Sequence, residues 1–494
     1  MHFIADPSKE VSLKRWAVAG VLSILLLCLW RDFSLLTKYP VAVGIDGYYY
    51  VLQVDTLRTK GHFWFPIKTP LIIYLITSLS YLAPNSIIAI KISSLLFHSL
   101  ISLGVFALVT SITRQYWAGL IGFILTAIPT SRLFLIGEFI SNSGGLAFFI
   151  WSVWFAIKTR QNKKVVYAIP SIVCFLAAVF SHRSILLLAI FFVISTLPVY
   201  LLMAQDRGLI YKWGALGFAV VILIAPALIM IQPFIPVPEW LRSEFATVPH
   251  WSITRVALAD RLILLVASLG IFSVLFLRRN EQPNQPMIFL GSIALFSLLV
   301  TLNPFLSDGD GLRGIAGRLC SLAYLQVALL VPGLIWLSMQ KEPRKAIYVI
   351  ATIVPLLTLS AKAPIPRGIG DDYLQARLTL IQKLPLSRAA LVDNSFIVAS
   401  HGNQFVVTST IGIPSQQSMP VDNHYQRIYW LIDGVEKKLI TPANLVLMND
   451  TNNRSSILIE DSELRQQFAR LDPKDRHNLL LNNTHLSRSN IFLP

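Results

Sequence analysis

The stretch that decides the fold is VGIDGYYYVLQVDTLRTKG, which runs from Val43 to Gly61. It follows an apolar run, Trp16–Trp30, and opens a long non-spanning segment that ends near Pro70. Asp46 therefore lies just outside a predicted membrane helix. Because an unpaired carboxylate is costly against lipid, an acid at this boundary is expected to face water or a polar cavity, where it can take part in chemistry. Asp is also a favoured N-cap residue, so the alternative is that Asp46 only caps a helix beginning at Gly47.

The composition is that of a polytopic α-helical membrane protein. Hydrophobic residues make up 54% of the 494 residues and charged residues 14%, with a mean hydropathy of +0.61. A helix needs roughly 20 mostly apolar residues to cross the hydrocarbon, and about eleven such windows recur along the chain. The predicted spans are Trp16–Trp30, Ile87–Thr110, Trp117–Leu135, Gly145–Ile157, Val166–Phe180, Ile185–Met203, Trp213–Ile231, Leu262–Leu277, Met287–Leu302, Leu319–Met339 and Ala346–Leu359. Leu71–Leu82 is apolar but short, which favours an interfacial or re-entrant helix.

Basic residues beside the spans predict the orientation, because short cytoplasmic loops are enriched in Lys and Arg. With the N-terminus inside, every inner connection is basic. The residues concerned are Lys9, Lys14, Arg15, Arg114, Lys158, Arg160, Lys163, Lys164, Arg207, Lys212, Arg278, Arg279, Lys341, Arg344 and Lys345. The pattern predicts an odd number of crossings and a C-terminal segment outside the cytoplasm, and the compact loops favour a bacterial inner membrane. The net charge of +16 then follows from this topology and from contacts with anionic membrane lipids, without a nucleic-acid partner.

A change in composition after Lys362 predicts two domains. Residues 1–362 are expected to form the transmembrane domain, with residues 31–86 as its first external loop. After the linker Ala363-Pro364-Ile365-Pro366, residues 363–494 predict an extracytoplasmic soluble α/β or α+β domain. Its β-rich runs are Phe396–Ala399, Gln404–Val407 and Leu445–Met448, and Ser462–Leu471 favours a helix. His401-Gly402 is typical of a turn between two strands.

The three cysteines, Cys28, Cys174 and Cys320, lie within or at the edge of apolar spans. No CxxC pair and no Cys/His ligand spacing accompanies them. We therefore expect neither a structural disulfide nor a zinc site.

Polar and basic residues in the external connections are the candidates for a site, since orientation rules leave those connections poor in Lys and Arg. Besides Asp46 and Tyr49, they are Lys68, Glu138, Asn142, His182, Arg183, Arg313 and Arg318. We expect them to converge on one cavity at the outer leaflet. Arg and Lys bind phosphate through charge-assisted hydrogen bonds, and a carboxylate can act as a general base, so the set suits a phosphorylated lipid. For each basic residue alone, snorkelling or a surface ion pair is the alternative.

The first external loop also carries a recognisable pattern: an acid, an aromatic residue, an amphipathic helix that ends in Gly, and Lys-x-Pro before an apolar stretch. The matching residues are Asp46, Tyr49, Leu57, Gly61, Lys68 and Pro70. This pattern resembles the GT-C class of polytopic glycosyltransferases, which includes protein O-mannosyltransferases, the lipid A aminoarabinose transferases and, more distantly, the oligosaccharyltransferase catalytic subunit. The resemblance covers roughly residues 10 to 200, and the rest of the chain only in architecture.

The resemblance implies an inverting transfer of sugar from a polyprenyl-phosphate donor to an acceptor that the sequence does not identify. Asp46 would be the catalytic base or an acid that orients the acceptor, Lys68 would hold the donor phosphate, and Glu138 would be the second acid of the class. Two residues depart from the pattern: many members have Asp-Glu where this chain has Asp46-Gly47, and often Asp where Glu138 stands. A divalent metal would need more carboxylates than these two, so a mechanism without a cofactor is favoured.

Two other functions stay open. A non-catalytic subunit could keep a GT-C-like scaffold for assembly or binding, and Gly47 leaves room for that reading. A transporter or lipid flippase would line a pathway with intramembrane charges, but the sequence shows no internal repeat and no matching pair of interrupted spans.

The predicted orientation can be tested with a cysteine in place of Ser462, in the C-terminal domain. It should react with a membrane-impermeant maleimide in intact cells, because the domain is expected outside. The wild type, whose cysteines lie in apolar spans, gives the background. Labelling that occurs only after lysis would reverse the orientation.

Overall fold

The computed structural model describes residues 7–137, 139–182, 184–203, 258–277, 285–302, 322–341, 354–355, 369, 372–388, 391, 393–420, 424–436, 444–449, 454–483 and 486. The chain divides into two compact units. The first, here the membrane unit, contains Met1–Asp32, Lys68–Ile72 and Ser94–Pro366. The second, here the sheet unit, contains Phe33–Ile67, Ile73–Ser93 and Arg367–Pro494. The first loop thus belongs mostly to the same unit as the C-terminal residues.

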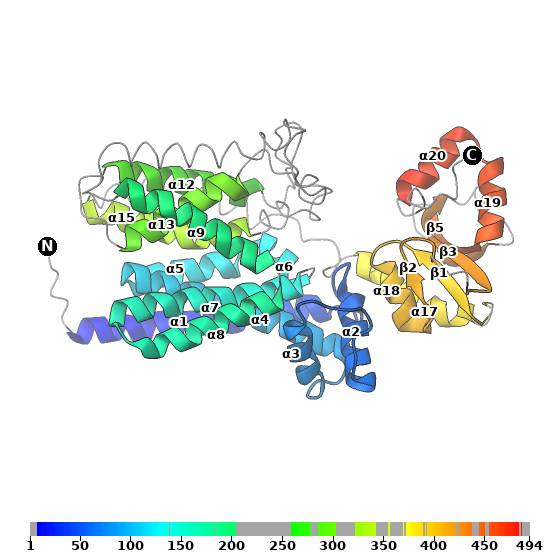
Figure 1. Cartoon of the computed structure of the whole chain (residues 1–494), viewed down its shortest axis with the longest axis horizontal. Helices are drawn as coiled ribbons and strands as arrows, with labels where there is room; N and C mark the ends of the chain where they lie inside the picture. Colours follow the sequence, from blue (N-terminus) through cyan, green and yellow to red (C-terminus); the bar gives the residue numbers. More distant parts are fainter. Residues whose placement is uncertain are drawn as a thin grey trace. The chain divides into compact units, whose positions relative to one another are not determined.

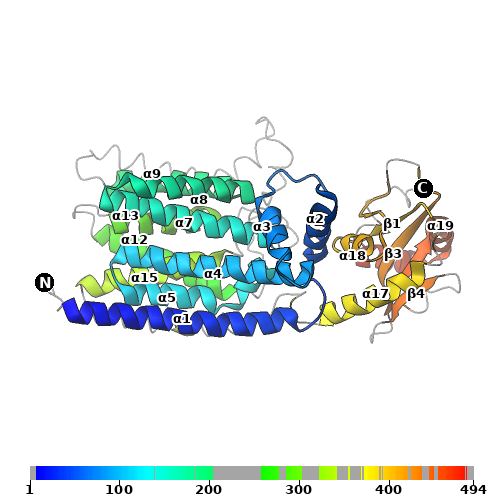
Figure 2. The same cartoon turned by 90° about the horizontal axis from the view of Figure 1, so that it is seen from below.

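Apolar helices that lie side by side form the membrane unit (Figures 1 and 2). They are α1 (Pro7–Thr37), α4 (Ser86–Thr113), α5 (Tyr116–Ala127), α6 (Leu133–Gly137), α7 (Ile140–Asn162), α8 (Ala168–Ser181), α9 (Ser184–Met203), α12 (Leu258–Leu277), α13 (Gln285–Phe296) and α15 (Ala323–Lys341), of which α1 and α4 extend into the sheet unit. Among the described residues, four helices are long and apolar enough to cross a membrane, or five if a bent pair is one span. The count of about eleven spans stays a prediction. Trp213–Ile231, and Ala346–Leu359 apart from Val354 and Pro355, lie outside the described residues.

The third predicted span, Trp117–Leu135, is not one straight helix. α5 ends at Ala127, and the chain resumes as a 3₁₀ turn, Thr130–Arg132, followed by α6. The two parts are bent by 64°. Pro129 lies at the break, and proline lacks the amide hydrogen that would continue the helix. The last carbonyls of α5 consequently need other partners.

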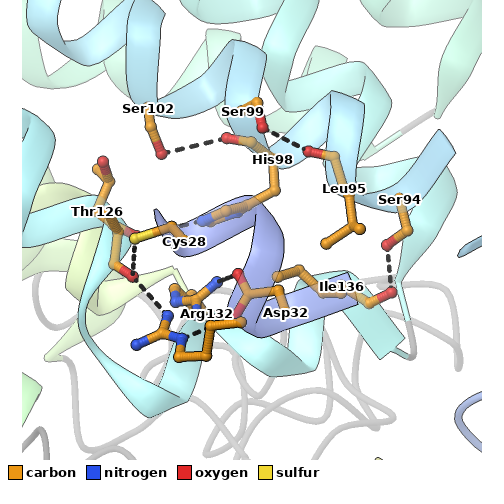
Figure 3. Close-up of polar contacts among 12 residues, drawn as sticks. Cys28, Asp32, Ser94, Leu95, His98, Ser99, Ser102, Thr126, Arg132 and Ile136 are labelled. Carbon is orange, nitrogen blue, oxygen red and sulfur yellow. Dashed lines mark hydrogen bonds and ion pairs between the residues drawn. The ribbon is translucent and has the colours of Figure 1, made fainter. Parts of the chain in front are cut away.

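Side chains from α1 and α4 supply those partners. Arg31 donates from Nη2 to the Ala127 carbonyl at 3.1 Å, and the Cys28 thiol lies 3.8 Å from the same oxygen. Nε2 of His98 lies 3.2 Å from the Thr126 carbonyl (Figure 3). In hydrocarbon an unpaired carbonyl costs several kcal/mol, so these contacts stabilise the break.

A buried ion pair holds the same place together. Arg132, in the 3₁₀ turn, donates Nη1 and Nη2 to the two carboxylate oxygens of Asp32 at 2.6 and 2.7 Å (Figure 3). Its side chain is 2% exposed and that of Asp32 is 5% exposed. The bidentate geometry lets each charge neutralise the other inside the unit. It ties the end of α1 to the bend after α5.

The sheet unit contains a five-stranded sheet of order β2-β1-β3-β5-β4. The strands are β1 (Ser395–Ala399), β2 (Ser415–Gln416), β3 (Arg427–Glu436), β4 (Leu445–Asn449) and β5 (Arg454–Glu460). β1 runs parallel to β2 and β3, and the β3–β5 and β5–β4 pairs are antiparallel. The helices of this unit are α2 (Gly47–Lys60), α3 (Leu71–Ser80, except its first two residues), α17 (Asp372–Arg388), α18 (Asn403–Ile411), α19 (Asp461–Arg470) and α20 (Pro473–Asn482).

Both faces of the sheet are covered. Phe396 and Trp430 share one buried cluster with Phe468 of α19 and Leu479 of α20. The alternate side chain Ile397 is buried too, as the two-residue period of a doubly covered strand requires. α17 contacts β4, and α18 contacts β1 and β2 (Figure 1).

Most elements expected in the C-terminal domain are confirmed, with one exception. Phe396–Ala399 and Leu445–Met448 are strands, and Ser462–Leu471 is helical except at its last residue. Gln404–Val407, however, lies inside α18 and is not β-rich. Val406 and Val407 are fully buried there, so packing outweighs their preference for strands. The turn at His401 therefore leads from a strand into a helix.

The buried ion pair yields a stability prediction. Asp32→Ala should lower the free energy of unfolding by about 3–5 kcal/mol, because it leaves the Arg132 charge buried without its partner. Thermal unfolding of the purified protein in detergent measures the loss.

Two variants serve as comparisons. Arg31→Ala should cost much less, since the Arg31 side chain is 48% exposed. Replacing Asp32 and Arg132 together by Leu should recover most of the stability, because no lone charge remains. An Asp32→Ala protein as stable as the wild type would show that the pair does not hold the bend.

Candidate functional site

Asp46 stands at the start of α2, but its side chain does not cap the helix. It occupies the N-cap position with φ −88° and ψ 4°, and no capping hydrogen bond is made by its carboxylate. Its backbone carbonyl accepts the amides of Tyr49 at 2.9 Å and Tyr50 at 3.4 Å. The capping alternative therefore does not account for the acid, and its carboxylate is available for other contacts.

The partner of the carboxylate is His401. Nε2 of His401 lies 2.7 Å from Oδ1 of Asp46, and the two side chains are 41% and 34% exposed. Oδ1 itself is buried and has no aligned hydrogen bond among the described residues. The contact is thus a close approach of an imidazole to a carboxylate oxygen. The exposed surface of the carboxylate group then falls on Oδ2.

Asp433 on β3 fixes the turn that carries His401. Ser400 donates from Oγ to Oδ2 of Asp433 at 3.1 Å, and Asn403 donates from Nδ2 to the same oxygen at 2.7 Å. Ser456 on β5 donates to Oδ1 of Asp433 at 3.0 Å. His401 lies between two residues bound to one buried strand, so its backbone has little freedom.

The turn and the first loop approach each other closely at a glycine. Gly402 has φ +88°, a backbone conformation that residues with a Cβ rarely adopt. A Cβ there would lie 2.8 Å from both the backbone oxygen and Cγ2 of Ile45. Glycine lets the turn contact the residue directly before Asp46.

Arg377 of α17 also binds the loop that precedes Asp46. Its guanidinium is buried and donates to the carbonyl of Gly44 and, at 3.4 Å, to that of Ile45. It also lies 5.9 Å from the centroid of the Tyr48 ring, which is a cation–π distance. Burial raises the pKa of Tyr48, so its phenol stays protonated and does not neutralise the arginine.

Gly47 departs from the acid that many GT-C members carry, and the structure gives a local reason. A Cβ on Gly47 would lie 2.9 Å from Cβ of Ala42. The loop folds back on the helix start too tightly for a glutamate. The departure is accounted for by packing.

Aromatic side chains pack beside the Asp46–His401 contact. The Tyr49 ring stacks with Phe65 at 6.2 Å and meets Phe405 of α18 edge-on at 5.5 Å. His401 meets Phe405 edge-on at 5.7 Å. Gln53 exchanges two hydrogen bonds with the backbone of Phe65, which restrains the chain at that residue. Burial and, to a smaller extent, the charge of Asp46 raise the pKa of Tyr49, so its phenol stays a hydrogen-bond donor at neutral pH.

The other predicted site residues are distributed as follows. Lys68, Asn142 and His182 belong to the membrane unit, whereas Asp46 and Tyr49 belong to the sheet unit. Glu138, Arg183, Arg313 and Arg318 lie outside the described residues. The convergence of the whole set on one cavity stays a prediction.

Within the membrane unit, Lys68 is exposed in the segment before α3. Asn142 is not in a loop, as expected, but in the first turn of α7, and its Oδ1 is buried without a hydrogen bond in the described part of the chain. His182 follows α8, and its amide donates to the Ala178 carbonyl at 3.1 Å. α7 packs closely at this end, because a Cβ on Gly144 would lie 2.2 Å from Cδ1 of Ile72.

The residues at this site supply few metal ligands. In the described ranges, no group of three or more His, Cys, Asp or Glu side chains could hold a metal ion. Asp46 and His401 give one oxygen and one nitrogen donor, and a catalytic zinc usually takes three protein ligands. This donor set does not fit a metal centre by itself.

The comparisons with known proteins establish a likeness of fold. No family model matches the chain, and no curated protein matches it in sequence. Among solved structures, it is similar to the Archaeoglobus fulgidus oligosaccharyltransferase, crystallised in complex with Zn and sulfate, with a TM-score of 0.52 and 11% identity. The match covers 79% of this chain and 62% of that one, so the chain spans about three-fifths of the oligosaccharyltransferase's length. The membrane helices and the small sheet thus have the fold of a GT-C-type protein.

Proposed function

We propose that the protein is a membrane glycosyltransferase that moves a sugar from a polyprenyl-phosphate donor to an acceptor on the extracytoplasmic face, with inversion. The observation that carries the proposal is Asp46: an acid in the first loop that makes no cap and keeps Oδ2 exposed, in a chain with an oligosaccharyltransferase-like fold. In a buried structural acid such as Asp32, both carboxylate oxygens bind protein groups. Among the described residues, Asp46 contacts a protein side chain only through Oδ1, that of His401.

In this mechanism the acceptor oxygen attacks the anomeric carbon while Asp46 takes the proton from that oxygen. The bond between the anomeric carbon and the phosphate oxygen breaks, and its electron pair leaves with the phosphate. A positioned base of this kind contributes on the order of 10²–10⁴ to the rate. Cationic side chains must stabilise the departing phosphate, and Lys68, Arg183, Arg313 and Arg318 are the proposed ones. Asn142, His182 and Tyr49 would contribute hydrogen bonds to the donor, and Glu138 would be the second acid.

A small apolar cavity in the membrane unit offers a place for part of a lipid chain. It has a volume of about 80 Å³ and lies among α4, α7, α9, α13 and α15. Phe149, Phe192, Phe289 and Phe296 line it, and Gln326 is its polar member. Such a lining suits a hydrocarbon chain better than a nucleotide, whose phosphates require polar partners.

The proposal includes no metal, because Asp46 and Glu138, the two predicted acids, provide fewer carboxylates than a divalent metal requires. A second candidate is a non-catalytic scaffold with this fold. The Asp46–His401 contact also fits this scaffold, because an acid paired with a histidine can have a purely structural role. A measurement of sugar-transfer turnover distinguishes the two functions.

Asp46→Asn should abolish sugar transfer while the protein stays folded and binds donor. Asn has the size of Asp but cannot accept the proton, so the rate should fall by on the order of 10²–10⁴. The measurement is turnover of lipid-linked sugars by purified protein, with thermal stability and donor affinity recorded alongside.

Asp55→Asn is the matched control, since Asp55 is an exposed acid on the same helix. It should keep normal turnover. Equal turnover in wild type and Asp46→Asn would remove Asp46 from the mechanism and move the base to Glu138. A wild type that transfers no sugar from any of a panel of donors would favour the scaffold.

Lys68→Ala should weaken donor binding by on the order of 10- to 100-fold, the range for loss of a hydrogen bond to a charged group. Lys68→Arg should keep most of the affinity, because the charge remains. Lys60→Ala, at an exposed lysine of the same loop, is the control. Binding of a polyprenyl-phosphate sugar is measured directly, and unchanged affinity in Lys68→Ala would assign this lysine to the membrane surface.

A further inference from the structure

We infer that His401 is a positioning residue for Asp46: it holds Oδ1 of the carboxylate and so presents Oδ2 to the acceptor hydroxyl. The inference rests on the proposed function. It assigns a residue of the C-terminal part of the chain to a site that the sequence placed wholly in external membrane loops.

The first argument is that the two oxygens of the Asp46 carboxylate have different surroundings. Oδ1 is buried, has no aligned hydrogen bond and lies 2.7 Å from Nε2 of His401, whereas the side chain as a whole is 34% exposed. A base must accept a proton along a defined direction, within hydrogen-bond reach of the reacting hydroxyl. Fixing one oxygen fixes the direction of the other.

The second argument is the rigidity of the histidine. Its backbone lies between Ser400 and Asn403, which both donate to Asp433, and its ring packs on Phe405. A flexible surface histidine would carry none of these restraints. The loop that bears Asp46 is held by Arg377. Both partners of the contact are therefore restrained by other residues of the fold.

The third argument is energetic. A contact between charged side chains as exposed as these contributes little to stability. Burial of Arg377 and the aromatic packing of Tyr49, Phe65 and Phe405 supply most of the attachment of the loop. The Asp46–His401 contact therefore contributes little to the stability of the fold. We assign it to the orientation of the Asp46 carboxylate instead.

The experiment compares His401→Ala with His401→Gln. In the alanine variant, kcat should fall by on the order of 10- to 100-fold, the effect of a misplaced reacting group. Donor affinity and the midpoint of thermal unfolding should stay unchanged. Glutamine, whose amide reaches close to the place of Nε2, should restore most of kcat, and added imidazole should restore part of it in the alanine variant. His424→Ala, at an exposed histidine of the same unit, is the control and should keep full kcat.

A second readout does not depend on turnover. Diethyl pyrocarbonate acylates an accessible neutral imidazole, and peptide mass spectrometry gives the rate at each histidine. In Asp46→Ala, acylation of His401 should speed up several-fold, because Nε2 loses its carboxylate partner, while His424 should react as in wild type. An unchanged rate at His401 would show that the contact does not exist in the protein.

The outcomes separate the two levels of the argument. Unchanged kcat in His401→Ala with an active wild type overturns the positioning role and leaves the glycosyltransferase standing. Loss of kcat together with loss of thermal stability, without rescue by Gln or imidazole, makes His401 a purely structural residue and also overturns the role. A wild type without turnover on any donor removes the proposed function, and the positioning role falls with it, whatever the acylation rates show.

Discussion

The candidate site depends on the hydrogen bonds that Arg377 donates to the Gly44 and Ile45 carbonyls, directly before Asp46. Residues 38–46 form no helix or strand, so their backbone groups need partners from elsewhere in the fold. One guanidinium can serve several carbonyls at once, and Arg377 donates to Gly44 and Ile45 from a buried position. Lys91 also donates from Nζ to the Tyr39 carbonyl of the same loop, at 2.9 Å. With these bonds, the acid has a fixed place beside the turn that carries His401.

The same principle appears in the membrane unit. Pro129 breaks a long apolar segment, and the carbonyls left at the end of α5 are met by Arg31 and His98. The buried Asp32–Arg132 pair adds a charge-neutral tie between α1 and the bend. In both units, irregular backbone is held by a cation from a distant part of the chain. Both charges of the membrane pair are buried, whereas the side chains of His401 and Asp46 are 41% and 34% exposed.

Much of the fold could be predicted because it follows from local pattern. Apolar windows located α1, α4, α7, α8 and α9, since the hydrophobic period and length are properties of contiguous residues. The helix after Asp46 ends at Gly61 in the left-handed conformation, as a glycine at that place predicts. The bend at Pro129 was missed because apolar composition continues across it. Gln404–Val407 was misread because burial against the sheet, and not strand propensity, decides its conformation.

The sequence by itself indicated the membrane character, the helical first loop and the mixed α and β content of the C-terminal part, and it selected Asp46 as the first candidate residue. These depend on composition and on residues near one another along the chain. Only the tertiary structure decided which groups meet Asp46. Arg377 and Gly44 are 333 residues apart, and no local signal links them or joins His401 to the acid. Each of these residues is ordinary in its own segment, because the contact forms only when the first loop folds against the strand-to-helix turn. The packing energy that holds the loop and the turn together is distributed over many side chains.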